Sequence, residues 1–116
     1  AVWVAHTAGV RAGAGEVLRL DAAGMRWRLP QGELTVPWPA VASVAVRSHG
    51  GSRVLRYRLA YGVAPNSPGI ISQVREPVFR RLTRLGLQLG SVGIDTPVDT
   101  ILAATAAFTG GRLAPR

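Results

Sequence analysis

Turn-forming residues interrupt the chain at short intervals across residues 16–61, and this spacing constrains the fold more than any other feature. Between the turns, apolar residues recur at every second position, which is typical of strands that bury one face. The clearest case is Met25, Trp27 and Leu29, which alternate with two arginines. The pattern predicts short antiparallel strands over residues 17–20, 25–29, 34–36, 41–46 and 53–61.

Residues 62–93 predict a less regular region. Residues 62–69 hold two prolines and two glycines, which indicates a loop. We interpret residues 70–74 and 87–89 as two further strands. Pro77 suits the first turn of a helix, and Val78, Leu82 and Leu85 recur at helical spacing, so we expect a short helix over residues 76–85.

The last predicted element is an amphipathic helix that begins near Thr96. Thr96 and Asp99 match a capping box, Pro97 suits the first helical position, and Gly110 suits a left-handed C-cap. The apolar stripe follows the i, i+3, i+4, i+7 spacing of one helix face and comprises Val98, Ile101, Leu102, Thr105 and Phe108.

Strands followed by such a helix predict an α+β fold: an antiparallel, partly open β-barrel or curved sheet capped by a C-terminal amphipathic helix. The length of 116 residues fits a single domain, residues 1–116. We expect its core to span about residues 16–109, with residues 1–15 and 110–116 peripheral.

Three segments, residues 17–27, 34–44 and 96–108, carry a family resemblance. On these segments the chain resembles the bacterial pleckstrin-homology-like (PH-like) domains, across about residues 16–109. The resemblance implies a partly open barrel closed by the helix, with binding rather than catalysis as its role. In phosphoinositide-binding pleckstrin-homology domains, one basic residue on the first strand and a basic-x-Arg pair on the second line the head-group pocket, and Arg19, Arg26 and Arg28 match that pattern.

The charge balance points to an anionic partner. All fourteen basic residues are arginine, and six acidic residues leave a net charge of +8. Arginine grips phosphate or carboxylate with paired hydrogen bonds. Alternation turns the arginines of two strands outward, namely Arg26, Arg28, Arg56 and Arg58, and together with Arg19 these are the candidate binding residues. A secondary basic cluster lies along the short helix and comprises Arg75, Arg80, Arg81 and Arg84. The alternative is that these side chains only solvate the surface.

The sequence lacks the residues that several classes of chemistry require. The chain has no cysteine and no lysine, which excludes thiolate sites and a Walker sequence. His6 and His49 have no second ligand at metal-like spacing, and His49 is expected in a solvent-exposed turn. Asp21 and Asp99 are interpreted as turn and helix-start residues. We therefore expect no enzyme activity, no metal and no cofactor.

The sequence thus predicts a non-catalytic PH-like interaction module that binds an anionic membrane surface or an acidic protein partner through exposed arginines. A small basic nucleic-acid-binding domain is the alternative, and it predicts exposed aromatic side chains among the arginines. An unrecognised small enzyme is the third hypothesis, and it predicts a pocket where His49 meets an acid. No small-molecule substrate is expected.

No stretch approaches the roughly 18 apolar residues of a membrane span. We expect a cytoplasmic location, with peripheral attachment or tethering at the inner membrane left open. Exposed strand edges leave self-association open as well.

Overall fold

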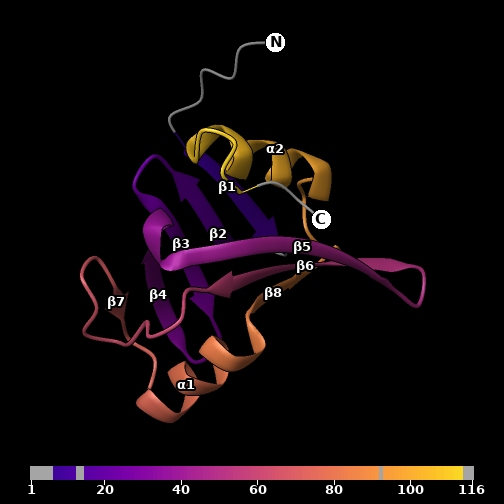
Figure 1. Cartoon of the computed structure of the whole chain (residues 1–116). Coiled ribbons are helices and arrows are strands. Elements are labelled where there is room, and N and C mark those ends of the chain that lie inside the picture. The colour runs from indigo at the N-terminus through magenta and orange to yellow at the C-terminus, as the bar shows by residue number, and fades with distance from the viewer. Residues whose placement is uncertain (1–6, 13–14, 92, 114–116) are drawn as a thin grey trace.

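The computed structural model describes residues 7–12, 15–91 and 93–113 (Figure 1). In chain order, its elements are β1 (Thr7–Ala12), β2 (Gly15–Asp21), β3 (Gly24–Leu29), β4 (Gly32–Pro37), the 3-10 turn Trp38–Ala40, β5 (Val41–His49), β6 (Ser52–Leu59), β7 (Ile71–Ser72), α1 (Glu76–Leu85), β8 (Leu87–Gly90) and α2 (Val98–Phe108).

The strands form two antiparallel sheets. One has five strands in the order β1-β2-β3-β4-β7, and the other has three in the order β5-β6-β8. Pro37, Pro39 and the 3-10 turn end the first meander, because proline cannot donate a ladder hydrogen bond. The predicted α+β class is confirmed. Within the described residues the two sheets do not close into one barrel.

The inward faces of the two sheets meet in one apolar core. Trp27 of β3 and Tyr57 of β6 pack edge to face, with ring centroids 5.9 Å apart. The helix α2 lies over one end of the sheets and α1 lies at the opposite end (Figure 1). The Tyr57 hydroxyl lies 2.6 Å from Thr105 Oγ1 of α2, and burial raises the pKa of Tyr57 to about 12. This hydrogen bond links β6 to α2 through the core.

Both ends of the chain contribute more residues to the folded core than the sequence predicts. Residues 1–15 were expected to be peripheral, but residues 7–12 form the edge strand β1 and Val10 is buried. Residues 110–116 were expected to be peripheral too, yet Leu113 is buried. Arg112 donates hydrogen bonds to Trp38 O at 2.6 Å and Val41 O at 3.0 Å, so it ties the C-terminal segment to the turn before β5.

The helix α1 matches its predicted span, whereas α2 begins at Val98, later than predicted. The predicted capping box of α2 is wrong: Pro97 holds the N-cap position, and Thr96 donates instead to Asp95 Oδ1 at 2.9 Å. Gly110 does adopt the predicted left-handed conformation, with φ of 62°. The helix α1 spans the predicted residues, although Phe79 is its buried side chain and Leu85 is 48% exposed.

Two predicted strands are shorter in the structure than the sequence predicts, whereas the other predicted strands are longer by one to three residues. The strand expected over residues 70–74 is only Ile71–Ser72, with Ile70 and Val74 buried beside it. The strand expected over residues 53–61 ends at Leu59. The chain turns directly after Leu59, so Tyr61 leaves the alternation and becomes fully exposed.

Candidate anion-binding surfaces

The five predicted site arginines lie on two different surfaces. Arg19 and Arg26 are register partners on β2 and β3, and Arg28 follows on β3. Arg56 and Arg58 lie on β6 of the other sheet. Because the inner faces of the sheets meet in the core, their outer faces point away from each other. The five arginines therefore do not form one patch.

The first surface is the outer face of the five-stranded sheet. Arg19, Arg26 and Thr35 lie in one row across β2, β3 and β4. Together with Asp21 and Pro37 they border a hollow of about 300 Å³. This is the surface that carries the Arg19, Arg26 and Arg28 pattern.

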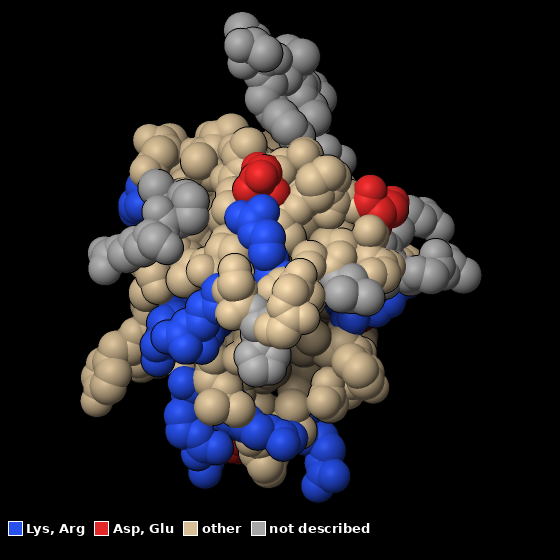
Figure 2. All heavy atoms as spheres, turned by 90° about the vertical axis from the view of Figure 1, so that its right-hand side faces the viewer, with Lys and Arg blue, Asp and Glu red and all other residues tan. Residues whose placement is uncertain are grey.

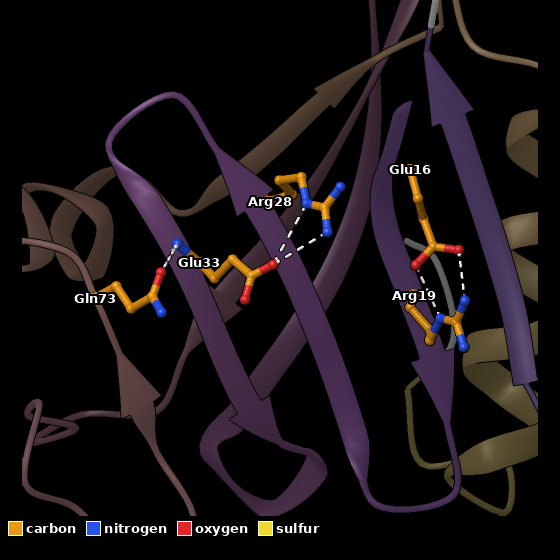
Figure 3. Close-up of polar contacts among 5 residues, drawn as sticks. All are labelled: Glu16, Arg19, Arg28, Glu33 and Gln73. Carbon is orange, nitrogen blue, oxygen red and sulfur yellow. Dashed lines mark hydrogen bonds and ion pairs between the residues drawn. The ribbon is translucent and has the colours of Figure 1, made fainter. Parts of the chain in front are cut away.

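Two of the three arginines on this surface are neutralised by glutamates (Figure 3). Glu16 accepts two hydrogen bonds from Arg19, at 2.8 and 2.9 Å, and the hydrogen bond and charge of Glu16 raise the pKa of Arg19 further above its ordinary value. Glu33 lies opposite Arg28 in the β3–β4 register and accepts from it at 3.3 Å. Among the described residues, Arg26 alone of these three joins no ion pair.

A β-bulge places Glu16 beside Arg19. Val10 opposes Leu18 while Arg11 opposes Glu16, so Val17 is an extra residue in the β1–β2 ladder. The extra residue shifts the alternation and turns Glu16 to the face that Arg19 occupies. Gly9 leaves the space for this pair, since a Cβ there would lie 2.6 Å from Glu16 Oε2.

The second surface joins the outer face of β6 to the C-terminal end of α1. Arg58 lies opposite Ser43 and Arg56 opposite Ala45, so only small side chains flank them on β5. The stem of Arg56 packs over Gly86, where a Cβ would meet Arg56 Cγ at 2.8 Å. Figure 2 shows blue side chains running from the middle of this side of the molecule to the α1 end, whereas the two most prominent red groups lie in the upper half.

Arg58 and Arg84 border one hollow of about 520 Å³, between the chain after β6 and the last turn of α1. Thr83 and residues 59–63 complete its lining. Neither arginine belongs to any of the ion pairs among the described residues, and no acidic residue lines the hollow. Tyr61 stands beside them fully exposed. The predicted strand over residues 53–61 places Tyr61 in phase with Tyr57 and Leu59 and so predicts that Tyr61 is buried, which is why the sequence alone does not reveal this arrangement.

The four arginines of the secondary cluster on α1 also differ from one another in their surroundings. Arg80 is paired with Glu76 one turn earlier. Arg75 is exposed at the N-cap position, and Arg81 borders a separate, largely apolar hollow with Leu82 and Leu85. Only Arg84 lies with a β6 arginine. Arg47 of β5, which the sequence analysis did not select, is also exposed on the outer face of the three-stranded sheet.

The described residues hold no group of three or more histidine, aspartate or glutamate side chains suited to a metal ion. Asp21 accepts hydrogen bonds from the backbone N–H groups of Ala23 and Gly24, at 2.9 and 3.0 Å, which confirms its role in the turn. Asp99 pairs with Arg53 at 3.1 Å. His6 and the side chain of His49 lie outside the described residues.

No protein-family model, curated protein or solved structure matches this chain. Within the part of the chain that the structure describes, neither helix has the length and apolar character needed to cross a membrane.

Proposed function

We propose that the chain is a non-catalytic, PH-like interaction module that docks on an anionic membrane surface through Arg58 and Arg84, with Tyr61 at the contact. The observation that carries the proposal is the juxtaposition, around a single hollow, of one fully exposed tyrosine and two arginines that join none of the ion pairs among the described residues. Basic side chains near a membrane surface each contribute about 1 kcal/mol of attraction to anionic lipid.

Tyr61 supports a lipid surface over a protein partner. Tyrosine favours the membrane–water interface because its ring is apolar and its hydroxyl is wet. Leu85, 48% exposed at the end of the same helix as Arg84, adds apolar area at this end of the molecule. The order of elements, a strand meander followed by a second sheet and a C-terminal helix, supports the PH-like part of the proposal.

Nucleic acid is the second candidate, and Tyr61 is also the observation that favours it. An exposed aromatic ring between arginines can stack on a base. Sequence-tolerant strand binding, however, uses successive aromatic platforms. Of the other aromatic side chains that the structure describes, Trp27, Trp38, Tyr57 and Phe79 are buried, and Phe108 is half-buried where it stacks on Trp38.

Co-sedimentation with vesicles of graded phosphatidylglycerol content, at low and high salt, tests the proposal. The test variant is Arg58→Gln/Arg84→Gln. The matched control is Arg19→Gln/Arg28→Gln, which removes the same charge from the surface that glutamates already neutralise. Single-stranded DNA and polyglutamate provide competing anions.

We expect salt-sensitive vesicle binding that falls roughly 10- to 30-fold in the test variant, from the loss of about 1 kcal/mol per arginine. The control should bind within about threefold of the parent chain. An equal loss in both variants would show that net charge, and not this hollow, governs binding. Binding to DNA or polyglutamate alone would replace the membrane with that partner.

A further inference from the structure

The chain that lines the hollow between β6 and α1 carries backbone donors as well as arginines. Residues 60–63 form a turn that the Val63 N–H closes by donating to Ala60 O at 3.2 Å. Gly62 has φ of 84°, which L side chains rarely adopt, and nothing lies within 4 Å of where its Cβ would be. Among the described residues, the N–H groups of Tyr61 and Gly62 donate no hydrogen bond. The turn therefore offers two unused backbone donors beside Arg58 and Arg84.

The charge of the hollow matches a doubly charged anion. Two permanently charged guanidinium groups line it, and no carboxylate of the described residues does. A phosphate monoester carries a charge of about −1.5 to −2 at neutral pH and three strong acceptor oxygens. A phosphodiester or a carboxylate carries one negative charge and has fewer oxygens for the fork of an arginine to grip.

We infer that this hollow binds a terminal phosphate group, a phosphomonoester, through Arg58, Arg84 and the Tyr61–Gly62 turn. The inference rests on the proposed function and narrows its ligand: the membrane lipid would be one whose head group ends in a monoester. The same chemistry would also accept a free phosphorylated small molecule, so the two sources need separate tests.

The lipid arm compares vesicles that contain phosphatidic acid, a monoester, with vesicles that contain phosphatidylglycerol, a diester, after their surface potentials have been matched. We expect the parent chain to prefer phosphatidic acid about tenfold, the size of one charge-assisted hydrogen bond. Arg58→Gln/Arg84→Gln should remove that preference. Arg26→Gln/Arg75→Gln, two exposed arginines outside the hollow, should keep it.

The soluble arm follows amide and arginine Nε–H resonances by NMR while inorganic phosphate replaces chloride at constant ionic strength. We expect the largest shifts at Tyr61, Gly62, Arg58 and Arg84, and their loss in Arg58→Gln/Arg84→Gln. The spectrum of that variant also shows whether it is folded.

The two arms separate the inference from the proposed function. Localised phosphate shifts without binding to any vesicle would uphold the phosphate site and overturn the membrane proposal. Equal binding to the two vesicle types, with no localised phosphate shift, would uphold membrane docking and overturn the phosphate site. Shifts spread over all exposed arginines would also overturn it, because they would indicate only general charge attraction.

Discussion

The two basic surfaces carry similar numbers of arginines and differ in where the acids lie. On the five-stranded sheet, Glu16 and Glu33 neutralise Arg19 and Arg28. At the β6–α1 hollow, Arg58 and Arg84 join none of the ion pairs among the described residues. Strand register and one bulge, more than the count of arginines, therefore decide which surface presents arginines outside ion pairs.

The largest expected effect concerns the scaffold that holds both surfaces. Tyr57 lies between Arg56 and Arg58 on β6 but points into the core, and burial raises its pKa to about 12 from the ordinary 10.0. Above pH 10 the unfolded chain loses the phenol proton while the folded chain keeps it. The free energy of unfolding should therefore keep its full value below pH 10. It should fall by about 2 to 3 kcal/mol as the pH rises to 12.

Urea unfolding at a series of alkaline pH values measures this loss, and Tyr57→Phe is the control that should lack it. Arginine stays charged over this range, so vesicle binding should disappear only where the fold does. Loss of binding from a chain that is still folded would mean that something other than the arginines holds the anion.

Neutralising two glutamates should create a second anion-binding surface. In the Arg58→Gln/Arg84→Gln background, Glu16→Gln/Glu33→Gln releases Arg19 and Arg28 beside the already unpaired Arg26. We expect vesicle binding to recover by roughly tenfold or more, since each released arginine contributes about 1 kcal/mol. Co-sedimentation measures the recovery.

The matched control for this gain is Asp95→Asn/Asp99→Asn, which adds the same net charge away from the five-stranded sheet. Among the described ion pairs, it releases one arginine, Arg53, instead of two, and so should restore binding by no more than about fivefold. If both pairs of substitutions restored binding equally, the position of the acids would not explain the difference between the two surfaces.

Arg112 is the opposite case, because its guanidinium binds the backbone of the protein itself. Its guanidinium donates to Trp38 O and Val41 O. Arg112→Gln should lower the free energy of unfolding by about 1 to 2 kcal/mol and leave vesicle binding unchanged. Arg47→Gln, the same charge change at an exposed strand position, should not alter the denaturation midpoint. A binding defect in a stable Arg112→Gln variant would extend the anion surface to this end of the molecule.

Local signals predicted much of the fold. Alternation located β3, and helical spacing with Pro77 gave both ends of α1. The strand β1 was missed because its sequence lacks a run of alternating apolar residues, although Val10 is buried. Thr96 matched a capping box, but the helix begins one residue later than that motif requires.

The pairing of charges was much harder to foresee. Residues three apart on a regular strand face opposite sides, so Glu16 and Arg19 meet only because Val17 is bulged. The Arg28–Glu33 pair depends on the exact hairpin register. Alternation extended to residue 61 predicts a buried Tyr61, but β6 ends at Leu59 and the turn carries the ring into solvent. Outward arginines could be named from the sequence; their partners could not.

The smallest expected effect separates the two partners that the hollow could serve. Tyr61→Ser removes an exposed ring and leaves Arg58 and Arg84 in place. If the ring enters the membrane interface, vesicle binding should weaken by about fivefold, or roughly 1 kcal/mol of apolar contact. Tyr61→Phe should largely preserve binding. Ile71→Ser, which changes an exposed apolar residue on β7 of the other sheet, should also leave vesicle binding unchanged.

Co-sedimentation and single-stranded DNA binding are measured on the same samples. A Tyr61→Ser chain that binds vesicles normally and loses DNA binding would mean that the ring stacks on bases, and the hollow would then be a nucleic-acid site.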